Sequence, residues 1–311
     1  MQNKKTLKIG SSDFKDIIEG NHYFVDKTMF IYEFFNRNSS VALISRPRRF
    51  GKTLNLSMLE YFFDIRKKRY NNLFSYLKIS KNKNFCETHQ NKHPVINITL
   101  KNVDENNWEN CLESLKSLIS KLYKNHDYLL KSDKIESYEK EIIMKIIRRS
   151  ASFIDLKNSL LDLSFYLRKY FSKKVIILVD EYDAPIINAF RNSNFDFEKK
   201  YYNNVIKNLQ KGLLTGVMRV GKESLFSKWN NLKVFPITSK HFSEYFGFTE
   251  KETKDLLSYF NLESNFKNVK KWYDGYIFGD TDKIYNPWSI VNYISDNEED
   301  FKAYWVNTSA D

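Results

Sequence analysis

The chain has 311 residues, of which 42% are apolar and 16% aromatic, so it can bury one large core or two modest ones. Its 9 glycines and 5 prolines exclude a collagen-like repeat and argue against long disordered linkers or an all-β sandwich with many turns. The formal charge of +12 suits an anionic partner, but the basic residues are spread along the chain, so a lysine-rich solvated surface accounts for most of it.

Features that direct a chain to a membrane or to secretion are not found in the sequence. Residues 1–5 are polar and lead into no apolar segment of a signal peptide. No stretch approaches the ~18 consecutive apolar residues of a membrane span. The two cysteines, Cys86 and Cys111, lack the spacing of a disulfide framework or zinc site. We therefore expect a cytoplasmic protein with no membrane partner.

The first 38 residues are expected to form a segment that docks on the core. Residues 23–28 precede a helix expected over 29–36, and a polar turn follows at 38–40. Asp26 and Lys27 fit an ion pair that docks this segment better than a catalytic pair.

Residues 41–53 carry the most informative pattern of the chain. A strand expected at 41–45 leads into a loop ending in Gly51, Lys52 and Thr53, and a helix is expected from there to about residue 65. This order suits phosphate binding, because backbone N–H groups and the positive end of the helix dipole point at the anion. Lys52 would reach the β- and γ-phosphates of ATP, and the Thr53 hydroxyl would bind Mg²⁺.

The loop differs from the G-x-x-x-x-G-K-[ST] pattern at its first position, where Arg46 replaces glycine. Pro47 then fixes φ and removes a backbone donor. From these residues alone, an ordinary helix N-terminus remains the alternative. The candidate nucleotide-binding residues are Arg48, Arg49, Phe50, Gly51, Lys52, Thr53 and Leu54.

Further along the chain, two carboxylates follow a strand of five apolar residues expected at 175–179. Before it, residues 67–93 read as irregular with a short helix at 73–77, a second strand is expected at 94–100, and helices at 107–124, 133–147 and 154–170. Carboxylates at the end of a buried strand are costly unless a cation or a reacting water lies there. Asp180 suits Mg²⁺, and Glu181 suits polarising the water that attacks the γ-phosphate. The alternative is an acidic turn in solvent.

Helices are then expected to about residue 210, followed by strands at 213–219 and 234–237. Arg219 falls at the end of the fourth strand, at the sheet edge where open α/β proteins bind ligands. It would sense the γ-phosphate and stabilise transition-state charge, with a surface salt bridge as the alternative.

Strands that alternate with helices predict an α/β fold with a mainly parallel sheet and helices on both faces. We expect the three-layer αβα sandwich of a P-loop NTPase, with a mostly helical C-terminal lid or accessory region. The expected division is a docking segment at 1–38, an NTPase core at 39–240 and the helical region at 241–311.

Several motifs, in order along nearly the whole chain, are similar to those of the AAA-ATPase-like family of bacterial proteins. They lie at residues 23–28, 46–53, 179–185, 215–219, 222–226, 246–250, 272–276 and 285–289. The resemblance implies ATP and Mg²⁺ as cofactors, and it implies that Arg46 is the family's own variant of the loop. Many members continue after the residues that match 304–309 into a nuclease-like domain with a PD-(D/E)xK core. This chain ends at Asp311, and no nuclease residues are assigned to it.

Three functions stay open from the sequence. The first is a Mg²⁺-dependent ATPase that acts as a switch or motor, with Lys52, Glu181 and Arg219 as catalytic residues and Thr53 and Asp180 as metal ligands; by analogy alone it would serve defence against foreign DNA. The second is a nucleotide-dependent binding or regulatory module with little hydrolysis. The third is a DNA- or RNA-binding protein. A protein partner or homo-oligomer also stays open.

Overall fold

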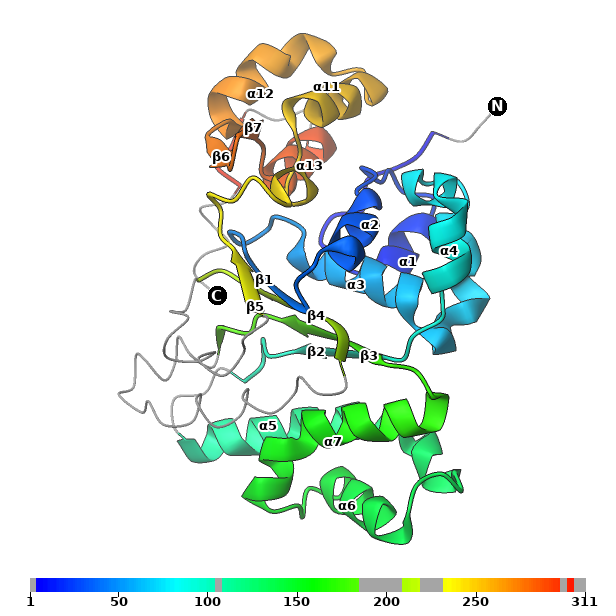
Figure 1. Ribbon diagram of the computed structural model, residues 1–311. Helices are drawn as coiled ribbons and strands as arrows, with labels where there is room; N and C mark the ends of the chain where they lie inside the picture. The colour runs from blue at the N-terminus through cyan, green and yellow to red at the C-terminus, as the bar shows by residue number, and fades with distance from the viewer. Residues whose placement is uncertain (1–3, 104–107, 185–208, 219–231, 297–300, 305–311) are drawn as a thin grey trace.

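A five-stranded parallel sheet forms the centre of the molecule (Figure 1). The computed structural model describes residues 4–103, 108–184, 209–218, 232–296 and 301–304. The strands of the sheet are β1 (Val41–Ser45), β2 (Val95–Thr99), β3 (Val175–Asp180), β4 (Leu209–Gly216) and β5 (Leu232–Phe235). Their order is β2-β3-β4-β1-β5. Because the strands are parallel, the ends of β1, β4 and β3 meet at one edge of the sheet.

Both faces of this sheet are buried, which explains the continuous apolar runs of its strands. Successive side chains of a strand point to opposite faces. Val41 and Leu43 of β1 therefore belong to one apolar cluster, and Ala42 and Ile44 belong to the other.

Helices cover each face, as expected for a three-layer αβα sandwich (Figure 1). The helices on one side are α5 (Trp108–Lys124), α6 (Ser137–Ile147) and α7 (Phe153–Phe171). The helices on the other side are α1 (Phe14–Glu19), α2 (Met29–Asn36), α3 (Lys52–Phe63) and α4 (Lys83–His89). Short 3₁₀ helices connect them at η1 (Ile65–Phe74), η2 (Lys78–Lys81) and η3 (Asp127–Lys131).

The described residues from Phe242 onward, here called the C-terminal region, lie beyond the ends of β1 and β5 (Figure 1). They comprise η5 (Ser243–Tyr245), α11 (Glu250–Tyr259), η6 (Glu263–Asn265), α12 (Phe266–Tyr273), β6 (Tyr276–Phe278), β7 (Thr281–Ile284) and α13 (Pro287–Ser295). The helices enclose an apolar cluster of their own. Phe278 and Ile284 of the hairpin instead belong to a cluster of the main sheet, so the hairpin joins the two parts.

The N-terminal segment contacts this C-terminal region through Lys27. Its ammonium group donates to Glu252 Oε1 at 2.7 Å and to the carbonyl oxygen of Glu244. Asp26 has other partners, since it accepts from the backbone N–H of Thr28 at 2.9 Å and of Lys78 at 2.7 Å. The ion pair that docks the segment therefore joins Lys27 to Glu252, which is 225 residues away.

The elements differ from the sequence-based expectation in three places. Residues 67–93 hold more helix than predicted, in η1, η2 and α4. The C-terminal region contains the antiparallel hairpin β6–β7. The fourth strand begins at Leu209, within the span predicted as helical, because Lys211 satisfies its ammonium group on the carbonyl oxygens of Arg37 and Ser39 and can therefore enter the sheet. The helices predicted over 185–208 lie outside the described residues.

Within the described residues, no helix combines the length and apolar character that crossing a bilayer requires.

Candidate nucleotide-binding site

The loop between β1 and α3 lies at the carboxyl end of the sheet. β1 ends at Ser45, and α3 begins at Lys52 with Gly51 as its N-cap. Gly51 has φ 80°, a conformation that favours glycine, and no atom lies within 4 Å of where its Cβ would be. The first turn of a twelve-residue helix therefore opens onto the loop, and its free N–H groups and dipole favour an anion there.

Lys52 is buried and points into the loop. Its Nζ donates to the carbonyl oxygens of Arg46 at 3.0 Å and Pro47 at 2.8 Å. Burial lowers the pKa of Lys52, and the three carboxylates at the end of β3 act against this shift. The ammonium group is thus held inside the loop by two neutral acceptors.

Asp180 joins the loop to the neighbouring strands. Its Oδ2 accepts from the Thr53 hydroxyl of α3 at 2.6 Å, and its Oδ1 accepts from the Thr215 hydroxyl of β4 at 2.6 Å. Asp180 and Thr215 are buried, whereas Thr53 is exposed. One carboxylate oxygen therefore bonds within the sheet, and the other bonds to an exposed residue at the start of α3.

Glu181 lies next to this centre in a left-handed backbone conformation, with φ 50°. Such a conformation is uncommon for a residue other than glycine, and it turns the chain sharply at the end of β3. Its N–H donates to Asp180 Oδ1 at 3.1 Å. Burial raises the pKa of Glu181, and the charge of Asp180 adds to that shift. A carboxyl group of raised pKa is a better proton acceptor.

A second buried carboxylate, Asp183, holds the end of β4. Its Oδ2 accepts from the N–H groups of Val217 at 2.8 Å and Met218 at 2.7 Å. Gly216 makes this approach possible, because a Cβ there would lie 2.5 Å from Asp183 Oδ1. The turn after β3 and the exit of β4 are therefore fixed to each other.

Comparison with known proteins assigns the chain to a family. The model of a family described as predicted AAA-ATPase matches residues 8–226. The chain belongs to the predicted AAA-ATPase family. A curated protein of Azotobacter chroococcum mcd 1, described as an uncharacterized protein in the vnfD 5′ region, is 26% identical over 315 residues. That similarity covers 98% of this chain and 54% of the Azotobacter protein, so the chain spans about half the length of this relative.

A solved structure, the Walker-type ATPase PABY2304 of Pyrococcus abyssi, is also similar. It shares 16% sequence identity with a TM-score of 0.44, over 99% of this chain and 74% of that one.

The fold brings four of the residues predicted for an ATPase site together, namely Lys52, Thr53, Asp180 and Glu181. Arg219 lies outside the described residues. Sequence reasoning did not single out Thr215 or Asp183. Thr215 could have been found by the rule that singled out Asp180, because it too is a polar residue near the end of a buried strand.

The other predicted loop residues differ in their surroundings. Arg48 is exposed and its charge contributes to lowering the pKa of Lys52, whereas Arg49 lies over the ring of Trp288 at 4.0 Å. The side chains of Phe50 and Leu54 pack into an apolar cluster. Contacts from Phe50 and Leu54 to a ligand at the loop would therefore come from their backbone.

The residues around Asp180 fit a magnesium ion that is shared with a phosphate. Mg²⁺ prefers oxygen ligands and is usually held by one or two carboxylates, phosphate oxygens and water. Thr53 Oγ1 and Asp180 Oδ2 supply two such oxygens 2.6 Å apart. No group of three or more metal-binding side chains occurs in the described part of the chain. Phosphate oxygens and water would supply the other ligands of a metal bound by these two oxygens.

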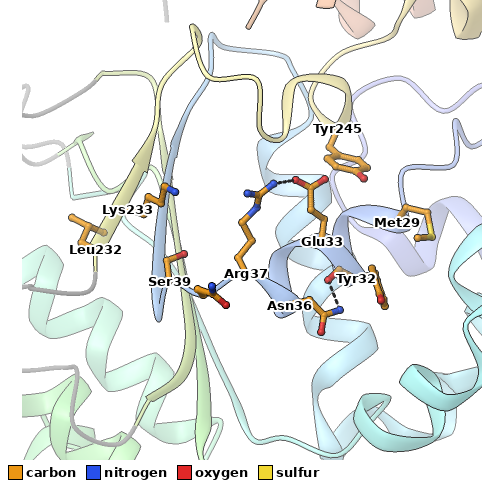
Figure 2. A pocket seen from close by; sticks show the side chains of 10 residues that line it. Met29, Tyr32, Glu33, Asn36, Arg37, Ser39, Leu232, Lys233 and Tyr245 are labelled. Carbon is orange, nitrogen blue, oxygen red and sulfur yellow. Dashed lines mark hydrogen bonds and ion pairs between the residues drawn. The ribbon is translucent and has the colours of Figure 1, made fainter. Parts of the chain in front are cut away.

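A separate pocket of about 910 Å³ has residues near the starts of β1 and β5 in its lining, whereas the candidate site lies where the strands end (Figure 2). It is lined by one side of α2 from its first residue to its last, by residues 37–39 before β1, by Tyr245, and by Leu232 and Lys233 at the start of β5. Arg37, its central cation, is paired with Glu33 and contacts the His241 ring at 2.7 Å. None of the predicted site residues that the structure describes lines this pocket.

Proposed function

We propose that this chain binds ATP with Mg²⁺ at the β1–α3 loop and hydrolyses it. One contact carries the proposal, the hydrogen bond of 2.6 Å between Thr53 Oγ1 and Asp180 Oδ2. It joins the helix start that follows the glycine-lysine-threonine turn to the carboxylate at the end of β3. The start of a phosphate-binding helix and an acidic strand end then lie in direct contact, as phosphoryl transfer requires. Membership of a family of predicted ATPases supports the same assignment.

Each residue has a role that follows from its position. Lys52 would exchange the carbonyl oxygens of Arg46 and Pro47 for the β- and γ-phosphates, which are stronger acceptors because they are charged. Thr53 and Asp180 would hold Mg²⁺, which, when bound, neutralises charge that develops on the phosphate oxygens.

The water that attacks the γ-phosphate would be oriented by Glu181, whose raised pKa favours acceptance of a proton. Arg219, three residues after the end of β4 and outside the described residues, is proposed to stabilise charge on the γ-phosphate. The cycle would serve a switch or a motor.

Two substitutions test the assignment. Lys52→Ala should abolish ATP binding in calorimetric titration. Lys211→Ala is its matched control, since Lys211 is a buried lysine that also donates to two backbone carbonyl oxygens. It lies near the start of β4, at the opposite end of the strands from the site. Glu181→Gln should still bind ATP but hold it without releasing phosphate. Hydrolysis at the parental rate by Glu181→Gln would show that Glu181 is not the base.

The alternative of a nucleotide-dependent module with little hydrolysis is distinguished by the parent chain itself. Tight binding of ATP without phosphate release would favour it.

Nucleic-acid binding has less support from the contacts of the basic run at residues 66–69. Arg66 pairs with Asp64, Lys67 pairs with Glu60, and the Arg69 guanidinium lies over Tyr70. A DNA affinity that falls steeply with salt would support this alternative, since each neutralised phosphate contributes about one unit of log–log slope.

A further inference from the structure

Arg46 occupies the position where the phosphate-loop pattern has glycine, and its side chain is fully buried. Its Nη1 donates to the carbonyl oxygens of Ser45 at 2.8 Å and Phe235 at 3.0 Å. Its Nη2 reaches the carbonyl oxygen of Phe242 at 3.4 Å. The guanidinium group therefore joins the start of the loop to the end of β5 and to the beginning of the C-terminal region.

Two aromatic rings of the C-terminal region enclose the same guanidinium group. Its Cζ lies 5.4 Å from the ring centre of Phe246 and 5.2 Å from that of Phe278, within the range of cation–π attraction. Burial lowers the pKa of Arg46 to about 10.

Stability alone does not account for this arginine. Its Nε is buried without a hydrogen-bond partner, and none of the ion pairs of the described residues includes it. Burying a charge without a carboxylate partner costs free energy, and the hydrogen bonds to carbonyl oxygens must offset that cost. A planar guanidinium group with several N–H donors is suited to holding separate segments in one fixed geometry.

Other residues of the loop contact the C-terminal region as well. Phe50 packs against Tyr276 with ring centres 4.8 Å apart and against Phe278 at 5.2 Å. Arg49 lies over Trp288 of α13 at 4.0 Å. The loop is thus held by the C-terminal region on its apolar side, while its other side faces Asp180 and Glu181.

We propose that Arg46 is a positioning residue that fastens the phosphate-binding loop to the C-terminal region, so that ATP binding at the loop and the placement of this region influence each other. The link is direct, because the carbonyl oxygen of Arg46 also accepts from Lys52. Movement of Lys52 to the phosphates would break its hydrogen bond to the backbone carbonyl of Arg46, whose side chain contacts the C-terminal region. Such coupling is reciprocal, so a change in that region alters ATP affinity by the same factor. The inference rests on the proposed function.

Hydrogen–deuterium exchange of the parent chain tests the coupling without any substitution. A non-hydrolysable ATP analogue with Mg²⁺ should change exchange in residues 242–284 as well as in the loop. Arg46→Met should weaken analogue binding by roughly tenfold and abolish the change in residues 242–284, measured under conditions where urea unfolding shows the variant to be folded. Arg46→Lys, which keeps the charge without the fork, should behave like Arg46→Met.

Arg37→Met is the matched control. The Arg37 guanidinium also lies over Phe242, at 5.1 Å, but it contacts Glu33 and His241 rather than the loop. This substitution should leave both analogue affinity and the exchange response at their parental values.

The outcomes distinguish failure of the coupling from failure of the proposed ATP binding. Analogue binding by the parent without any change in residues 242–284, together with parental affinity of Arg46→Met, overturns the coupling and leaves the proposed ATP binding intact. A parent chain that binds no nucleotide overturns both. If Arg46→Met does not fold, Phe278→Leu replaces it, because this change removes the ring beneath Arg46 and Phe50 from outside the loop. Phe278→Leu should then weaken analogue binding by the same factor, and parental affinity would refute the coupling.

Discussion

The two threonines that donate to Asp180 offer a matched pair of substitutions with opposite expected effects. Each hydroxyl lies 2.6 Å from one carboxylate oxygen. Thr215 is fully buried within the sheet, whereas Thr53 is exposed at the start of α3. Valine replaces threonine with nearly the same shape, so each substitution removes one hydroxyl and little else.

The magnitudes follow from what can replace each hydroxyl. A hydrogen bond to a charged group contributes about 1.5–3 kcal/mol, and a buried acceptor that loses it has no water to take its place. Thr215→Val should therefore lower the free energy of unfolding by about 1.5–3 kcal/mol, although Asp180 Oδ1 keeps the N–H of Glu181 at 3.1 Å. Thr53→Val should lower it by less than about 1 kcal/mol, because Thr53 is exposed and water can take the place of its hydroxyl.

Nucleotide binding should show the reverse order. If Thr53 binds Mg²⁺, Thr53→Val should weaken Mg²⁺–ATP binding by roughly tenfold or more, which corresponds to about 1.4 kcal/mol, and leave metal-free ATP binding nearly unchanged. Thr215→Val should leave both affinities close to parental. Urea unfolding without nucleotide and calorimetric titration with and without Mg²⁺ provide the two measurements. Equal losses of stability in the two variants, or equal Mg²⁺–ATP affinities, would refute the reasoning.

Three further predictions concern other parts of the molecule. Gly216→Ala should cost about 1–3 kcal/mol in urea unfolding and slow phosphate release, because the new Cβ would meet Asp183 Oδ1 at 2.5 Å; parental stability would contradict this overlap. Burial lowers the pKa of His126 to about 3, so the unfolded chain binds a proton there below about pH 6.5 while the folded chain does not. The free energy of unfolding should therefore fall by about 1.4 kcal/mol per pH unit on acidification from about pH 6.5 towards pH 3. His126→Gln should make this dependence on pH less steep. An unchanged dependence on pH in the variant excludes His126 as its source. Lys27→Met should lower the free energy of unfolding by about 1–3 kcal/mol, less than the loss of a fully buried pair, because the Glu252 side chain is 21% exposed. The variant should also be cleaved faster by protease in its N-terminal segment. The double variant with Glu252→Gln should recover part of the lost stability, and no recovery would argue against the ion pair.

The sequence by itself was sufficient for the parts of the fold that depend on local pattern. A strand, a loop with glycine before Lys52, and a helix are consecutive in the chain, so their periodicity and turn chemistry suffice to predict them. The same holds for β3, whose apolar run ends in Asp180 and Glu181. Parallel strands place their carboxyl ends at one edge, which is why two distant motifs could be expected to meet.

Tertiary structure alone decided what lies around that meeting point. The carbonyl partners of Arg46 at Phe235 and Phe242 are 189 and 196 residues away, and no local pattern encodes such contacts. The placement of β4 between β1 and β3, which brings Thr215 to Asp180, likewise depends on packing across the whole sheet. Arg46 differs from the loop pattern in the sequence, yet in the fold it is a buried residue that joins separate segments. Only the folded chain supplies the carbonyl oxygens and aromatic rings that compensate its charge.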